Sequence, residues 1–143
     1  MRISERYIKM CEKAEEIQRE WKPERGDWCI EKKGKPLYPL LVVEISFIYC
    51  SDYGLSVFTE GGELRKVLQS DLTWLPTQEQ LQEMMGFYPH TWGYFLFFIK
   101  ETGAFGKFSS MNELWLAYVM SEKYQKVWDD WKEEWVKGGI HEV

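Results

Sequence analysis

The spacing of apolar residues changes once near the start of the chain, and this change constrains the fold more than any other feature of the sequence. Up to Trp21, apolar residues recur every three or four positions, which is the period of an amphipathic helix. After Gly26 the period becomes two, as in LVVEISFIYC. The sequence therefore predicts a helix over residues 1–22, followed by strands over residues 26–75.

Turn-forming residues divide the period-two region into four or five short strands. Asp52-Tyr53-Gly54 predicts one turn. Gly61-Gly62 fits a two-residue hairpin loop, in which both positions take a positive φ. Short strands with turns about every eight to twelve residues predict a small antiparallel sheet or an SH3-like partial barrel.

Two capping boxes predict helix starts after the sheet. Thr77 with Gln80, and Ser110 with Glu113, have the spacing at which each side chain bonds the other residue's backbone N–H. Gly86 stands where a left-handed C-terminal cap would end the first of these helices. We expect that helix to be short.

Helical spacing continues after Ser110, and Gly138-Gly139 closes the run. This spacing predicts one long terminal helix, with its apolar stripe at Leu114, Ala117, Met120, Tyr124, Trp128, Trp131 and Trp135. Between the two capped helices, residues 91–101 are apolar on all sides and rich in β-forming residues. We expect a buried helix there, with a strand as the alternative.

Together these patterns predict an α+β fold in one domain over residues 1–143. The N-terminal helix comes first, then the antiparallel sheet or partial barrel, then two or three helices within residues 77–137.

The charge and the cysteines exclude several classes of protein. A net charge of −5 argues against nonspecific nucleic-acid binding, which depends on Lys and Arg neutralising phosphates. Three cysteines with no paired spacing are typical of free thiols in a reducing cytoplasm. No apolar stretch is long enough to predict a signal peptide or a membrane span.

No motif for catalysis, metal binding or cofactor binding stands out. The possible ligands are scattered at Cys11, Cys29, Cys50, His90 and His141, without the close pairs typical of metal sites. His90 is the one serious candidate for a general base, and no glycine-rich elbow surrounds a serine or cysteine. We therefore expect no metal and no cofactor.

Aromatic residues are the feature with functional potential. Eight Trp, eight Tyr and eight Phe make up 17% of the chain. Most of these side chains should lie in the core, where they bury a large area each. A surplus left outside would suit a protein partner or a second copy of the chain. The candidate interaction residues are Trp74, Trp128, Trp131 and Trp135.

Four strings mark a resemblance. EEIQREWKPERGDW, WLPTQEQLQEMM, SMNELWLAYVM and EKYQKVWDDW resemble a group of small uncharacterised proteins from phages and prophages of bacteria. The resemblance implies an accessory protein of a mobile element in the bacterial cytoplasm, and it implies no activity or catalytic residue.

The leading hypothesis is a non-enzymatic module that binds a protein through aromatic residues outside the core. The alternative is a small β domain that binds nucleic acid, with its phosphate contacts from Lys32, Lys33, Lys35, Arg65 and Lys66. The third is an enzyme, favoured only if His90, Cys50 or an acidic pair converges in a cleft.

Overall fold

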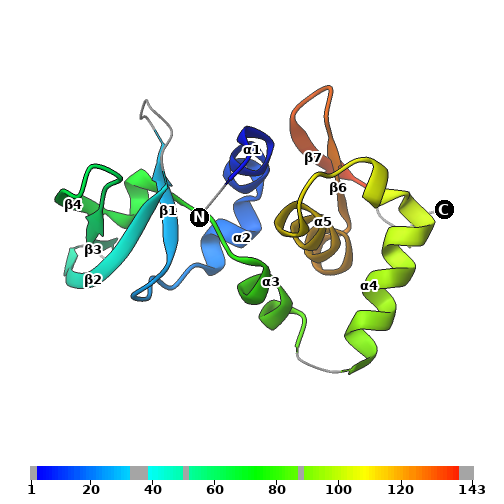
Figure 1. Ribbon diagram of the computed structural model, residues 1–143, viewed down its shortest axis with the longest axis horizontal. Coiled ribbons are helices and arrows are strands. Elements are labelled where there is room, and N and C mark those ends of the chain that lie inside the picture. Colours follow the sequence, from blue (N-terminus) through cyan, green and yellow to red (C-terminus); the bar gives the residue numbers. More distant parts are fainter. Residues whose placement is uncertain (1–2, 33–38, 50–51, 87–88, 139–143) are drawn as a thin grey trace. The chain divides into compact units, whose positions relative to one another are not determined.

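The computed structural model describes residues 3–32, 39–49, 52–86 and 89–138. Contacts within the backbone divide the chain into two compact units, Met1–Pro76 and Thr77–Val143. The first unit holds the sheet and the N-terminal helices, and the second holds three further helices and a hairpin (Figure 1). The predicted α+β fold is confirmed.

Two helices stand where one was predicted at the N-terminus. Helix α1 covers Glu5–Lys13, with Ser4 as its N-cap, and α2 covers Glu15–Glu20. The predicted continuous helix over residues 1–22 is wrong because Ala14, with φ −84° and ψ 70°, breaks the helical path. The apolar stripe survives the break, and Tyr7, Met10 and Ile17 are all buried.

The sheet has five strands in the order β4-β3-β2-β1-β5, and every neighbouring pair is antiparallel. The strands are β1 (Trp28–Glu31), β2 (Leu40–Tyr49), β3 (Asp52–Phe58), β4 (Leu64–Leu68) and β5 (Leu72–Trp74), with a short 3₁₀ turn, η1 (Gln69–Asp71), before β5.

An ion pair shows that this sheet is curled. Arg65 on β4 pairs with Glu31 on β1, although β3 and β2 lie between these strands. In a flat sheet three strand spacings of about 4.8 Å each would separate the two backbones. The pair therefore indicates a curved sheet, and β4 and β5 form no pair among the described residues that would close it.

Both predicted turns in the sheet differ from the structure. Residues 52–54 do not turn the chain but begin β3, and the preceding connection at residues 50 and 51 lies outside the described part of the chain. The glycine turn is a five-residue loop over residues 59–63, closed by a 2.8 Å bond from Thr59 N–H to Glu63 O. Only Gly62 there has a positive φ, because the longer loop needs one left-handed residue.

The amide of Gln18 holds the helices of the first unit to the sheet. Its Nε2 donates to Cys11 O at 3.1 Å and to Trp74 O at 2.9 Å, while its Oε1 accepts from Trp74 N at 2.7 Å. The first bond is a second one to Cys11 O, which also accepts from Ala14 N–H at 3.2 Å at the break after α1. The other two give β5 a partner on the side away from β1.

The second unit begins with the capping box predicted at Thr77 and Gln80, and both of its hydrogen bonds are present. Helix α3 covers Gln78–Met84, and Gly86 follows with a φ of 80°, as expected for a left-handed cap. Helix α4 covers Pro89–Thr102, which resolves the ambiguity over residues 91–101 in favour of a helix. A 3₁₀ turn, η2 (Ala104–Gly106), comes next.

The predicted long terminal helix is wrong beyond Tyr124. Helix α5 starts at its predicted cap, Ser110, but covers only Met111–Tyr124. Gln125 then takes a left-handed conformation with φ 53°, and the chain forms a hairpin of β6 (Lys126–Asp129) and β7 (Glu134–Lys137). Trp128 and Trp135 lie opposite each other across this hairpin, 5.3 Å apart between ring centroids.

A local hydrogen-bond pattern explains the hairpin turn. Asp129 Oδ1 accepts from the backbone N–H groups of Trp131 and Lys132, which is the turn-forming habit of aspartate. Glu133 completes the turn with a φ of 52°. A period of 3.6 in the tryptophans is therefore accidental, because the cross-strand pair, not a helical stripe, brings two of them together.

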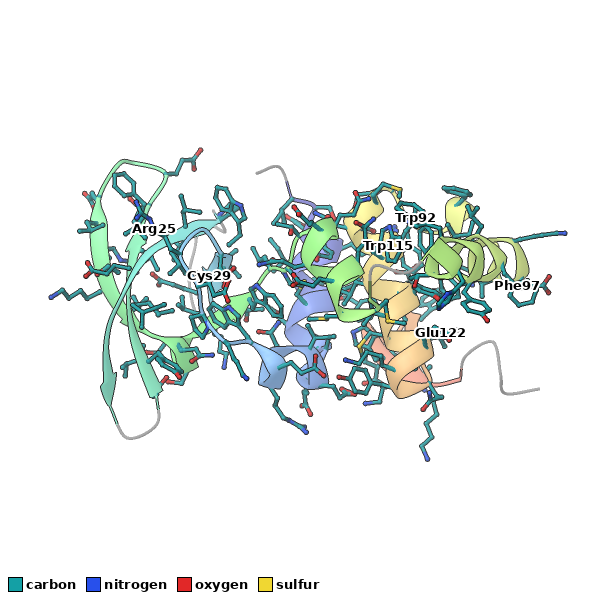
Figure 2. All side chains as sticks on the ribbon, turned by 90° about the horizontal axis from the view of Figure 1, so that it is seen from below. Arg25, Cys29, Trp92, Phe97, Trp115 and Glu122 are labelled. Carbon is teal, nitrogen blue, oxygen red and sulfur yellow. The ribbon has the colours of Figure 1, made fainter. Side chains whose placement is uncertain are left out.

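Helix α5 lies in the middle of the second unit, with α3, α4 and the hairpin around it (Figure 1). All of residues 113–121 are buried. Trp115 stacks on Phe95 of α4 with 4.0 Å between ring centroids, and Trp92 and Tyr118 meet it edge-on. Figure 2 shows Trp92 and Trp115 side by side at this contact. This aromatic cluster is the core of the unit.

We predict that Gln18→Ala lowers the free energy of unfolding by about 2–3 kcal/mol, because it removes the partners of both backbone polar groups of Trp74 and one of the two bonds to Cys11 O. The matched control is the neighbouring substitution Arg19→Ala, which removes only an exposed ion pair with Glu15 and should cost less than about 0.5 kcal/mol. Urea denaturation followed by circular dichroism measures both. Equal losses for the two variants would contradict the role assigned to the amide.

Candidate functional site

The described thiols are poor nucleophiles. Cys11 and Cys29 are both free and buried. Burial raises the pKa of Cys11 far above its usual value, and raises the pKa of Cys29 to about 12. Both groups therefore stay protonated at neutral pH, whereas catalysis needs the thiolate. Cys50, Lys33, Lys35 and His141 lie outside the residues whose side chains are described.

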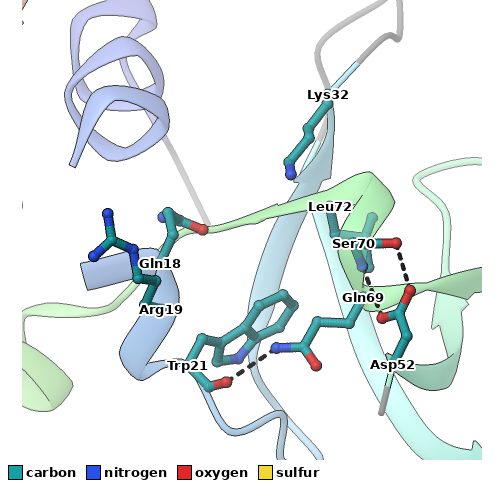
Figure 3. A pocket seen from close by; sticks show the side chains of 8 residues that line it. All are labelled: Gln18, Arg19, Trp21, Lys32, Asp52, Gln69, Ser70 and Leu72. Carbon is teal, nitrogen blue, oxygen red and sulfur yellow. Dashed lines mark hydrogen bonds between the residues drawn. The ribbon is translucent and has the colours of Figure 1, made fainter. Parts of the chain in front are cut away.

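The first unit contains a pocket of about 450 Å³ (Figure 3). Its lining residues come from η1 and from the ends of α2, β1, β3 and β5, and are Gln18, Arg19, Trp21, Lys32, Asp52, Gln69, Ser70 and Leu72. The volume falls in the range of small-molecule sites.

The polar groups of this pocket mostly hold its walls together. Gln69 donates to Trp21 O at 3.0 Å, and Ser70 bonds to Asp52 through both its backbone N–H and its hydroxyl. Ser70 and Asp52 do not make a nucleophile and base in the usual sense, because a carboxylate is a weak base without an intervening imidazole. The pocket can hold a polar molecule by hydrogen bonds, but the described side chains show no catalytic arrangement in it.

Trp74 is a core residue. Its side chain is 6% exposed and stacks on Trp21 with 6.1 Å between centroids and an interplanar angle of 4°. The indole of Trp21 in turn donates to the buried carboxylate of Asp27 at 2.9 Å. Burial gives Trp74 no surface on which a partner could act.

The three hairpin tryptophans have different environments. Trp135 is 8% exposed and Trp128 is half-buried, so most of this pair belongs to the core. Trp131 is 96% exposed at the turn. Of the four predicted interaction residues, Trp131 is the one that offers a large free aromatic surface.

The basic residues of the nucleic-acid hypothesis form no single surface in the described part of the chain. Arg65 is engaged by Glu31. Lys66 is the next residue on β4 and so points to the opposite face of the strand. Lys32 follows β1 and lines the pocket.

Helix α4 carries an exposed aromatic face that sequence reasoning missed. Thr91, Phe95, Phe98 and Ile99 are buried on one side. Trp92, Tyr94, Leu96 and Phe97, which we name the α4 face, remain between 49% and 61% exposed. Figure 2 shows Phe97 on the side of α4 away from α5.

The charged residues of α4, Lys100 and Glu101, lie in its last turn. No charged residue lies between His90 and Lys100, which stand near the two ends of the helix. Surface helices of soluble proteins normally place charged and polar residues on the outer side. The four side chains spread over roughly 200° of the helix circumference, because successive residues are about 100° apart. Several large exposed apolar side chains on one helix favour contact with another molecule.

Three comparisons with known proteins bear on identity. No family model, no curated protein and no solved structure matches the chain. Within the described residues, no helix is long and apolar enough to cross a bilayer, and no group of three or more His, Cys, Asp and Glu could hold a metal ion.

The sequence shows that α4 is apolar, but it does not show how much of the helix other elements cover. Residues 91–101 are apolar on every side, and we expected the helix to be buried on every side. That expectation was wrong, because only one side of α4 is covered in the structure. Periodicity reports how many faces of a helix are apolar, not how many neighbours are available to cover them.

We predict that the two buried thiols resist modification in the folded chain. In a Cys50→Ser background, Cys11 and Cys29 should react with a thiol reagent such as DTNB only as fast as the chain opens, and at once in denaturant. Ellman absorbance over time measures this. Rapid reaction of either thiol in native buffer would contradict the burial described above.

The same burial predicts a loss of stability at high pH. Above about pH 8.5 the thiols of the unfolded chain ionise, while Cys29 in the folded chain stays protonated up to about pH 12. Each buried thiol should therefore lower the free energy of unfolding by up to about 1.4 kcal/mol per pH unit in this window. A Cys29→Ala variant should show a shallower decline than the parent.

The hairpin provides a matched pair of substitutions. Trp135→Ala should lower the free energy of unfolding by about 3 kcal/mol, because it removes a buried indole and its cross-strand partner contact. Trp131→Ala should change it by less than about 0.5 kcal/mol, because that side chain lies in solvent. Urea denaturation measures both, and a large loss for Trp131→Ala would show that the turn is not as described.

Proposed function

We propose that this chain is a non-enzymatic protein-interaction module of a phage or prophage, and that the α4 face is its contact surface. The observation that carries the proposal is the set of four large, half-exposed apolar side chains on a helix whose charged residues, Lys100 and Glu101, lie in its last turn. We still expect aromatic residues outside the core to bind a partner, but we now place the binding surface on α4 and not at the terminal tryptophans.

The energy of burial supports this choice. Each of the four side chains exposes on the order of 100 Å², about half of what such residues bury in a core. A partner on one side of the helix covers about half of this roughly 400 Å², because Trp92 and Tyr94 project from nearly opposite sides, and that burial contributes about 5 kcal/mol at 25 cal/mol per Å². Association itself costs about 4–15 kcal/mol. The α4 face is therefore large enough to drive binding only if the partner also contributes apolar surface.

The architecture of the unit supports it as well. Trp92 belongs both to the α4 face and to the aromatic cluster, where it meets Trp115 at 5.4 Å. Stacking of Phe95 on Trp115 fixes the rotation of α4 about its own axis. A binding surface on a helix held this way loses little freedom on association, which favours affinity. The resemblance to phage and prophage proteins is the ground for the proposed biological context.

Site-specific photocrosslinking in bacterial cells tests the proposal. With p-benzoylphenylalanine at position 94 on the α4 face, illumination should produce adducts with a protein, either another protein or a second copy of this chain. The matched control places the same group at Phe58 on β3, which is 44% exposed in the other unit. We expect at least fivefold more adduct at position 94 by gel and mass spectrometry.

Equal labelling at the two positions, or no protein adduct at position 94, would contradict the proposal. Introducing Phe97→Ser, three positions along the helix and so beside the crosslinker, should abolish the position 94 adducts without changing those at position 58. Circular dichroism of the purified variants checks that α4 remains folded.

A further inference from the structure

The pocket of the first unit has two cations with unused hydrogen-bond donors at one end. Lys32 and Arg19, at the ends of β1 and α2, are both exposed and both line it. In Figure 3 the Lys32 side chain points from β1 toward the α2 side of the pocket, where Arg19 lies. Among the residues that the structure describes, none pairs with the Lys32 ammonium. Arg19 bonds to Glu15 at 3.4 Å in solvent, and such an exposed pair is easily exchanged for another anion.

The middle of the pocket offers apolar surface and one amide. Trp21 and Leu72 are buried, but both line the pocket. Gln69 uses one hydrogen of its amide to donate to Trp21 O at 3.0 Å. A glutamine amide has two hydrogens and an accepting oxygen, so Gln69 keeps one donor and one acceptor for a ligand.

A carboxylate lies at the other end. Asp52 and Ser70 lie on the far side of Gln69 from Arg19 (Figure 3). The backbone N–H of Ser70 donates to Asp52 Oδ1 and its hydroxyl donates to Oδ2. A carboxylate accepts about four hydrogen bonds in all, so these two leave room for donors from a ligand.

We infer that this pocket binds a small hydroxylated organic anion. Its carboxylate or phosphate group is held by Lys32 and Arg19, as is usual for these two residue types. Its hydroxyl groups donate to the oxygens of Gln69 and Asp52. Its carbon skeleton lies against Trp21. This site lies in the first unit and goes beyond the function proposed for α4 in the second.

The charge of the pocket favours an anion. Two cations, Arg19 and Lys32, and one carboxylate, Asp52, line it, so its net charge is +1 in a chain whose net charge is −5. Asp71 accepts from the Lys32 backbone N–H at 3.0 Å through its own backbone oxygen, but does not line the pocket. A cleft lined by one sign of charge raises the local concentration of ligands with the opposite sign.

The volume sets the size of the ligand and its affinity. About 450 Å³ lies in the lower part of the range for small-molecule sites. A sugar phosphate or sugar acid of five or six carbons is of suitable size. Because both cations are exposed, their contacts are partly screened by water. For a ligand of about fourteen non-hydrogen atoms we therefore expect a dissociation constant of about 1 mM.

Titration of the ¹⁵N-labelled full-length chain, followed by ¹H–¹⁵N correlation spectra, tests the inference. Ribose 5-phosphate is the phosphate probe and gluconate is the carboxylate probe. Ribose lacks the anion and inorganic phosphate lacks the carbon skeleton, so these two are the controls. At least one probe should saturate at about 1 mM and shift the side-chain amide signals of Gln69 and the indole signal of Trp21. Both controls should bind at least tenfold more weakly.

Two substitutions locate the anion. Lys32→Gln and Arg19→Ala should each weaken binding at least fivefold, because each removes a cation from the same end of the pocket. Both side chains are exposed, so neither change should unfold the chain. Lys66→Gln is the matched control, since it removes the same charge from an exposed lysine on β4 outside the pocket. It should change binding less than twofold.

Each outcome decides the inference. Saturation by ribose 5-phosphate alone identifies a phosphate ligand, saturation by gluconate alone identifies a carboxylate, and saturation by both supports the site for either group. No saturation by either probe up to about 10 mM overturns the inference. Binding that survives both Lys32→Gln and Arg19→Ala overturns it, because the anion then lies elsewhere. Binding of ribose or inorganic phosphate as tight as that of the probes overturns it too.

Discussion

The stacking of Phe95 on Trp115 is the interaction on which the second unit depends. Residues 113–121 of α5 are all buried, so this one helix fills the middle of a unit of fewer than seventy residues. The elements that surround it can each turn only one side inward. Helix α4 does so with Thr91, Phe95, Phe98 and Ile99, and its remaining apolar side chains have no element of the unit to cover them. The exposed face of α4 thus follows from the position of α5.

In the first unit, one amide has a comparable role for the backbone. Gln18 bonds to the end of α1 and to both polar groups of Trp74 in β5. Because β5 is an edge strand, its outer backbone groups would otherwise need water or another strand. The same side chain therefore provides hydrogen bonds to the backbone at the helix break and at the sheet edge. This explains why a polar residue lies between two otherwise apolar layers.

Several features of the fold followed from sequence because they depend on neighbouring residues. The capping box at Thr77 and the start of α5 at Ser110 use bonds between residues three positions apart, and both were predicted correctly. The strands around LVVEISFIYC and LSVF were also recognisable from their period. The hairpin at residues 126–137 was not, because Trp128, Trp131 and Trp135 happen to have helical spacing. The turn made by Asp129 overrides that spacing.

The sequence by itself determined the α+β class, the helix caps and the apolar character of α4, since these arise from local bonding and residue type. Only the tertiary structure decided which apolar surfaces are covered. Trp74 is buried against Trp21, while Phe97 and Leu96 face solvent, although all three are large apolar residues. Coverage depends on contacts between residues far apart in the chain, which no local pattern encodes. The α4 face, and with it the proposed function, therefore came from the structure.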